Sequence, residues 1–221
     1  MTYQIYTDGS TEPTNPGPSA YGFVVLNAKE EILHQQVGMW KRSTNQRAEL
    51  KAILEGLRWV SGLTQNLNQP FEVVVYSDSM YSINCLSNWW RSWEKHGWTR
   101  KAKSKIKGQK KEHLPVKNLD LIKPGVELQK ILSVKFQWVK GHSGVKWNEH
   151  VDTLVNDAAL KAEILGDVDA GYEGAEIISP VAQQREAEEE RDFLVETVEA
   201  LKAKGYTKEQ ILEAMEENHG A

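Results

Sequence analysis

The pattern of apolar and polar positions at the start of the chain predicts three short strands. Runs rich in β-branched and aromatic residues cover Tyr3–Thr7, Tyr21–Leu26 and Ile32–Gly38, and stretches rich in glycine, proline and asparagine separate them. Such runs, bounded by turn residues, are typical of antiparallel strands. From about Asn45 the period becomes helical, which predicts a helix. Its apolar positions are Leu50, Ile53, Leu54 and Leu57.

Strands and helices then alternate. A strongly apolar strand is predicted at 72–77, a short helix near 80–90 and a longer helix between 118 and 132. Pro124 is expected to break or restart that longer helix, because proline lacks the amide hydrogen. Hairpins followed by a β-α-β-α order predict an α/β fold, with a mixed five-stranded sheet flanked by helices. The remaining predicted elements are a strand at Val134–Lys140 and a helix from Asn148 to about Glu163.

The end of the chain predicts an appendage to this first domain, residues 1–163. Residues 164–182 are interpreted as a linker, since glycine, proline and acids dominate 166–180. Residues 183–221 predict an acidic helical hairpin in which Gly205 ends the first helix and a capping box starts the second. Two helices of this length bury little core alone, so we expect the hairpin to bind a protein partner or a second copy. Its apolar positions are Leu194, Val198, Leu201, Ile211, Leu212 and Met215.

Composition and charge exclude several classes of protein. The chain has 221 residues, 40% hydrophobic and 26% charged, with one cysteine, so a disulfide scaffold is excluded. No apolar run approaches the ~20 residues of a membrane span, and the start lacks a signal-peptide pattern, so we expect a cytoplasmic protein without membrane contact. Residues 91–117 hold 10 basic and 2 acidic side chains, whereas residues 161–221 hold 6 and 16. The basic segment predicts a polyanionic partner. A second interpretation of the acidic end is that it docks on this basic segment and competes with that partner, although its apolar positions slightly favour the binding of a protein.

Four carboxylates occupy positions that the folding pattern does not require. Asp8 and Asp78 each follow a predicted strand, while Glu49 and Asp152 share helix faces with apolar residues. Each alone is more often a turn former, a helix cap or a favourable charge at a helix start. Gathered at one sheet edge, they would repel one another unless divalent cations join them, and oxygen ligands suit Mg²⁺ or Mn²⁺. Such acid clusters support two-metal phosphoryl transfer.

Five short motifs follow one another along the chain. They are TDGS at 7–10, NQRAEL at 45–50, YSDSMY at 76–81, VKGHSG at 139–144 and NEHVDTLV at 148–155. In this order and spacing they closely resemble type 1 ribonuclease H, over about residues 3–162. The resemblance implies the ribonuclease H fold and an endonuclease that hydrolyses the RNA strand of RNA–DNA hybrids. It also implies products with 5′-phosphate and 3′-hydroxyl ends.

The resemblance assigns catalytic and metal-binding roles position by position. It implies two Mg²⁺ ions in the substrate complex, with Mn²⁺ as a substitute. His142 matches the family's mobile histidine, which assists proton handling or product departure. A lone histidine is more often structural, but the flanking Gly141 and Gly144 give this one mobility. The implied metal ligands and catalytic carboxylates are Asp8, Glu49, Asp78 and Asp152.

Contacts to the hybrid carry over in part. Asn15, Asn45 and Gln46 match minor-groove contacts of the family, and short amides suit the 2′-hydroxyls of a wide minor groove. Thr44 matches a contact to a DNA phosphate. The chain departs from the family at two places: the loop after Asp8 is one residue longer, and Met80 replaces a polar residue.

Residues 89–117 resemble the family's basic handle. Four tryptophans at 89, 90, 93 and 98 are expected to anchor it, because solubility alone would not gather half of the eight tryptophans there. A solvated loop is the plainer interpretation of the lysine-rich stretch 99–113. We expect its basic side chains to contact phosphates instead. The expected contacts of this handle are Trp89, Arg100, Lys101, Lys103, Lys105, Lys107, Lys110 and Lys111.

Three alternatives are weaker. A 3′–5′ exonuclease of a related fold would carry Asp-x-Glu, whereas Gly9 and Ser10 follow Asp8. A non-catalytic hybrid-binding module would lack at least one of the four carboxylates, and none is missing. An interaction protein acting through its acidic end would not need the catalytic set. Because that set precedes residue 160, truncation after about Leu165 is expected to leave an active enzyme.

Overall fold

The computed structural model describes residues 1–64, 71–101, 113–172 and 207. The chain divides into one compact unit over Met1–Gly171 and a second over Tyr172–Ala221. The predicted hairpin at 183–221 lies outside the described residues except for Thr207. None of the helices described here is long and apolar enough to cross a membrane.

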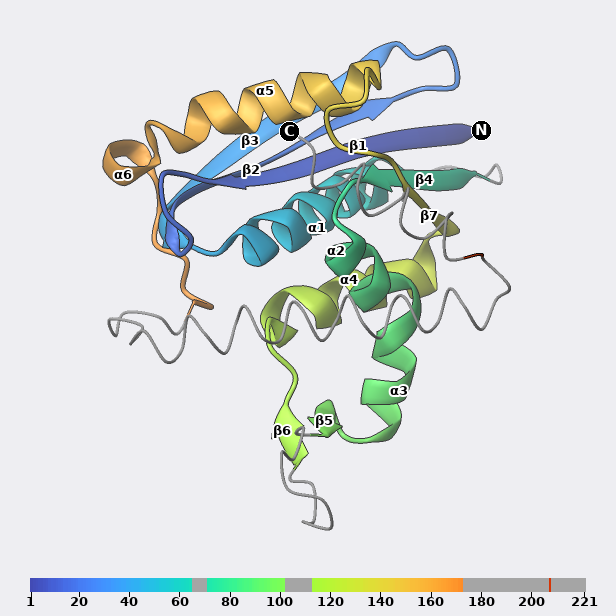
Figure 1. Cartoon of the computed structure of the whole chain (residues 1–221). Helices are drawn as coiled ribbons and strands as arrows, with labels where there is room; N and C mark the ends of the chain where they lie inside the picture. The colour runs from blue at the N-terminus through green and yellow to red at the C-terminus, as the bar shows by residue number, and fades with distance from the viewer. Residues whose placement is uncertain (65–70, 102–112, 173–206, 208–221) are drawn as a thin grey trace. The chain divides into compact units, whose positions relative to one another are not determined.

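A mixed five-stranded sheet forms the centre of the first unit, with the order β3-β2-β1-β4-β7 (Figure 1). The first three strands are antiparallel neighbours, and β1, β4 and β7 run parallel. This confirms the predicted α/β fold. The strands are β1 (Thr2–Thr11), β2 (Gly17–Leu26), β3 (Ile32–Ser43), β4 (Glu72–Ser77) and β7 (Val134–Trp138).

Helices cover both faces of the sheet (Figure 1). On one face α1 packs over β1 and β2 around Phe23, Ile53 and Leu57, and on the other α5 packs around Val24, Val151 and Val155. The apolar residues of each helix recur with the helical period because they form the face that is buried against the sheet. The longer helices are α1 (Asn45–Thr64), α4 (Leu119–Ile131) and α5 (Lys146–Ala159), and the short α6 covers Ala162–Leu165.

A helical segment follows β4 and leads into a small two-stranded sheet. Its middle turn, η1, is π-helical, which the sequence pattern does not predict. The elements are α2 (Met80–Asn84), η1 (Cys85–Trp89), α3 (Trp90–Lys95), β5 (Thr99–Lys101) and β6 (His113–Pro115).

Two sequence expectations about local structure are wrong. Pro124 does not break α4, because Leu121, Ile122 and Val126 on its inner face are buried in the core and hold the helix there. Strand β1 does not end at Asp8, because its antiparallel pairing with β2 continues to Thr11. Its parallel pairing with β4, however, ends at Tyr6.

Residues 166–171, which the sequence places in a linker, belong to the first compact unit. Asp167 pairs with the end of β3: its amide donates to the Met39 carbonyl and its carbonyl accepts from the Lys41 amide, both at 2.9 Å. Asp169 is buried. The segment 166–171 therefore extends the compact unit beyond residue 163.

Candidate active site

Three carboxylates meet where the parallel pairing of β1 and β4 ends. Asp8 lies on β1 just past that point, Asp78 directly follows β4, and Glu49 lies in the second turn of α1. One oxygen from each lies within 4.8 Å of the others. Gly9 permits this approach, since a Cβ there would lie 2.4 Å from the Glu49 backbone nitrogen. The missing side chain thus lets α1 bring Glu49 against β1.

Burial and mutual repulsion act on all three groups. Glu49 is only 5% exposed, and Asp8 is also buried. Burial, followed by the neighbouring carboxylates, raises the pKa of Asp8 and of Glu49 well above their ordinary values. Burial also raises the pKa of Asp78. Holding these three carboxylates together without a cation therefore costs free energy.

The cluster fits a divalent cation. The Oε2 atom of Glu49 is buried and has no hydrogen-bond partner in the part of the chain that the structure describes. A buried, unpartnered carboxylate oxygen is costly unless something positively charged faces it. The donors are all carboxylate oxygens, the ligand type that Mg²⁺ and Mn²⁺ prefer. Asp8, Glu49 and Asp78 can thus hold such an ion.

Asp152 and His142 lie beside this cluster. Asp152 on α5 is close enough to Asp8 to contribute to its raised pKa, after burial and Asp78. His142 is in the loop between β7 and α5, its side chain 65% exposed, with Nδ1 3.8 Å from Asp152 Oδ2. Its φ is 50°, and the Gly144 amide donates to Glu149 Oε1 at 2.6 Å. The loop therefore holds an exposed imidazole next to the fourth predicted carboxylate.

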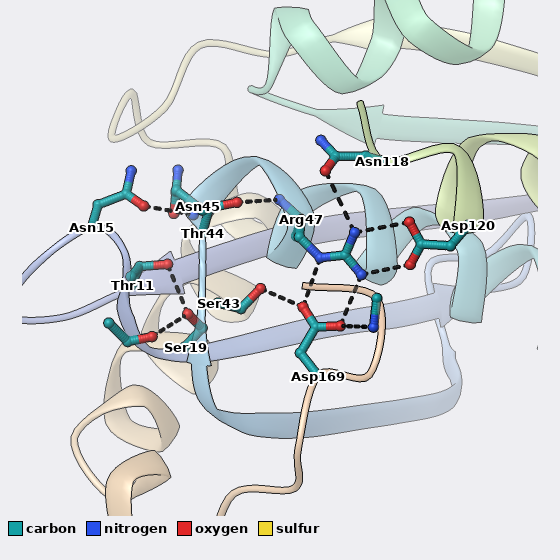
Figure 2. A network of polar contacts seen from close by, with 12 residues as sticks. Thr11, Asn15, Ser19, Ser43, Thr44, Asn45, Arg47, Asn118, Asp120 and Asp169 are labelled. Atoms are coloured by element: carbon teal, nitrogen blue, oxygen red, sulfur yellow. Dashed lines mark hydrogen bonds and ion pairs between the residues drawn. The ribbon is translucent and has the colours of Figure 1, made fainter. Parts of the chain in front are cut away.

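The residues expected to contact a hybrid gather at the start of α1 (Figure 2). The Asn45 amide donates to Asn15 Oδ1 at 3.2 Å, which joins the β1–β2 loop to the helix. Thr44 Oγ1 accepts from the Arg47 amide at 3.4 Å and caps α1, and Gln46 is exposed. Three of the four predicted contacts therefore lie at the start of the helix that carries Glu49, and Asn15 is hydrogen-bonded to it from the β1–β2 loop.

The tryptophans of the handle pack against the core, as expected of an anchor. Trp89 lies between Tyr81 and Trp93, with ring centroids 6.3 and 5.7 Å away, and Lys123 of α4 lies 5.0 Å above the Trp98 ring. Arg100 and Lys101 lie on β5. The other expected phosphate contacts, Lys103, Lys105, Lys107, Lys110 and Lys111, lie outside the described residues.

Sequence reasoning missed two polar groups behind the site. Arg47 and Asn148 are almost fully buried, and each contacts carboxylates (Figure 2 shows Arg47). A signal was present in both cases. Arg47 lies three and seven residues before Leu50 and Leu54, and Asn148 lies three and seven before Val151 and Val155. A polar residue in an apolar stripe of this kind needs a buried partner.

The comparisons of this chain with known proteins agree with one another. The family model described as RNase H matches residues 1–160. A "Ribonuclease H" from Pseudoalteromonas translucida is 38% identical over 173 residues, which cover 78% of this chain and 97% of that protein. LC9-RNase H1, described as a type 1 RNase H, aligns with a TM-score of 0.58 and 25% identity, over 82% of this chain and 84% of that one. LC11-RNase H1 in complex with RNA/DNA hybrid shares the fold, with a TM-score of 0.50 and 23% identity, over 72% of this chain and 98% of that one.

Proposed function

Because the chain belongs to the ribonuclease H family and is a ribonuclease H, we propose that it hydrolyses the RNA strand of RNA–DNA hybrids by a two-metal-ion mechanism. We further propose Mg²⁺ as its cofactor, Mn²⁺ as a substitute, and products with 5′-phosphate and 3′-hydroxyl ends. The observation that carries the proposal is that oxygens of Asp8, Glu49 and Asp78 lie within 4.8 Å of one another. One buried oxygen of Glu49 also has no partner among the residues that the structure describes.

The proposed mechanism gives each side chain a part. Asp8, Glu49 and Asp78 would hold the cations, and Asp152 would complete the set from α5. Divalent cations bound there would activate water and stabilise the leaving oxygen. The exposed His142 imidazole, 3.8 Å from Asp152, is suited to carry a proton between the site and solvent. Its glycine-flanked loop lets it approach and leave the product.

Recognition of the hybrid is proposed at the start of α1 and along the handle. Asn15, Asn45 and Gln46 would contact the minor groove, where RNA displays 2′-hydroxyls that DNA lacks. Thr44 and the basic handle would contact phosphates. The complex of LC11-RNase H1 with RNA/DNA hybrid supports this substrate class for a chain of the same fold.

The proposal is tested with a hybrid whose RNA strand carries a label. Metal-free protein should bind this hybrid without cutting it, and added Mg²⁺ or Mn²⁺ should start cleavage. Analysis of the product ends should find 5′-phosphate and 3′-hydroxyl groups. Cleavage that proceeds equally in excess EDTA would show that the carboxylate cluster does not work through a divalent cation.

We also propose that residues 183–221 bind a protein partner or a second copy of the chain. The support is the apolar spacing of Leu194, Val198 and Leu201 in an otherwise acidic segment. Truncation after Gly171 should then leave cleavage unchanged while lowering the oligomeric state or removing a partner. Light scattering of the full and the truncated chain at equal concentration checks whether the segment binds a second copy.

A further inference from the structure

Asn148 is buried at the first turn of α5 with little to stabilise it. Among the described residues, its side chain makes one hydrogen bond, from Nδ2 to Asp78 Oδ2 at 3.5 Å, and the residue is only 2% exposed. Its Oδ1 has no partner within the described ranges 1–64, 71–101 and 113–172. A buried amide with one long hydrogen bond and an empty acceptor costs stability relative to an apolar side chain of the same shape. The hydrogen bond that this buried amide does make goes to a carboxylate of the proposed metal site.

The amide does act on one atom of the proposed metal site. Asp78 Oδ2 lies against Asn148 and against the backbone of Gly141, where a Cβ would be 2.7 Å from this same oxygen. The Trp138 indole also donates to the Asp78 carbonyl at 3.0 Å. A carboxylate engaged and confined in this way keeps a single orientation, with one of its oxygens within 4.8 Å of oxygens of Asp8 and Glu49.

We propose that Asn148 is a positioning residue for the metal site, orienting the Asp78 carboxylate toward a divalent cation shared with Asp8 and Glu49. The inference rests on the proposed function, since it needs a cation at this cluster. Hydrogen bonds to ligating carboxylates fix the geometry of a metal site, and their loss typically weakens metal binding by about 10–100-fold. Asn148 also precedes Asp152 by one helical turn, so the same helix start carries both groups.

The test replaces Asn148 with leucine in the full chain, which keeps the branched shape but removes the donor. Calorimetric titration of metal-free protein with Mn²⁺ should show binding weakened by about tenfold or more. The thermal midpoint in EDTA should change little, because the lost hydrogen bond to Asp78 is offset by removal of a buried oxygen that has no partner among the described residues. At saturating Mn²⁺ the KM for the hybrid should not change. Thr153→Ala is the matched control: Thr153 lies on the same helix, its hydroxyl donates to the Glu149 carbonyl, and the variant should bind Mn²⁺ like the wild type.

A second variant, Gly141→Ala, places a new methyl group against the same Asp78 oxygen. The added Cβ must displace the Asp78 carboxylate, so Mn²⁺ binding should weaken without any change at Asn148. Wild-type affinity in both variants would overturn the positioning role while leaving the proposed function intact. A wild-type protein that binds no Mn²⁺ would instead overturn the metal site of the proposed function.

Discussion

The Asp169 carboxylate holds the Arg47 guanidinium through two contacts, Nε to Oδ2 at 2.7 Å and Nη2 to Oδ1 at 2.8 Å. Both side chains are only 3% exposed, and Ser43 also donates to Oδ2 at 2.6 Å. Asp120 of α4 binds the outer side of the same guanidinium at 2.6 and 2.8 Å (Figure 2). Arg47 thus ties the start of α1, which precedes Glu49, to α4 and to the segment after α6.

This ion pair changes the expected effect of truncation. Ending the chain after Leu165 removes Asp169 and leaves a buried guanidinium with one partner fewer, which should lower the free energy of unfolding by about 3–5 kcal/mol. Ending it after Gly171 keeps the ion pair and should have little effect. Urea denaturation of the two truncated forms checks this. Equal stability of both would show that Asp169 contributes nothing to the fold.

Asp8→Asn should abolish cleavage but stabilise the metal-free protein at neutral pH. Burial, then Asp78, raises the pKa of Asp8, so the folded state holds its proton more tightly than the unfolded state. Protonated Asp8 therefore stabilises the folded state below the unfolded pKa of about 4. This stabilisation is lost as pH rises through the raised pKa of the folded state. In EDTA at pH 7 the variant should therefore melt a few degrees higher than the wild type, and near pH 3 the difference should vanish. A lower midpoint at pH 7 would contradict the electrostatic account.

His142→Ala should slow cleavage without abolishing it. The imidazole is exposed and 3.8 Å from Asp152, outside the group of three carboxylates that approach within 4.8 Å. A group that only assists proton transfer contributes about 10²–10⁴-fold. The initial rate should therefore exceed that of Asp8→Asn measurably. Equal loss in the two variants would make His142 indispensable.

The lysines of the handle should act on substrate binding rather than on the chemical step. Those tested are Lys101, Lys103, Lys105 and Lys107. Their joint replacement by alanine should raise KM far more than it lowers kcat, since phosphate contacts form equally in the ground and transition states. The slope of log affinity against log salt should flatten by about 0.7–0.9 for each phosphate that the variant no longer neutralises. Lys29→Ala, an exposed lysine outside the handle, is the control. An unchanged slope would show that the handle does not bind the substrate.

The strand and helix order was predictable because each element buries one face with its own period. The same logic placed Asp8 and Asp78 near one edge, since parallel strands end together. The extension of β1 to Thr11 was not predictable, because it depends on pairing with β2 on the other side of the strand. The continuity of α4 through Pro124 depends on packing, with Gly125 close against Leu86 of the π-helical segment.

Contacts between residues distant in sequence set the rest of the site. Arg47 and Asp169 are 122 residues apart, and nothing in the glycine- and acid-rich stretch around Asp169 distinguishes it from a linker. Asn148 contacts Asp78 across 70 residues. A polar residue in an apolar stripe indicates that it needs a partner, but only the fold supplies the partner's identity.

The most direct measurement compares two substrates under one condition. Wild type and Asp78→Asn are incubated in Mg²⁺ with an RNA–DNA hybrid labelled on its RNA strand and with a DNA duplex of the same sequence. The account predicts that the wild type cuts the RNA strand and leaves the DNA duplex intact, because recognition needs 2′-hydroxyls. It also predicts that Asp78→Asn binds the hybrid without cutting it. Comparable cleavage of the DNA duplex, or near-normal cleavage of the hybrid by Asp78→Asn, would contradict it.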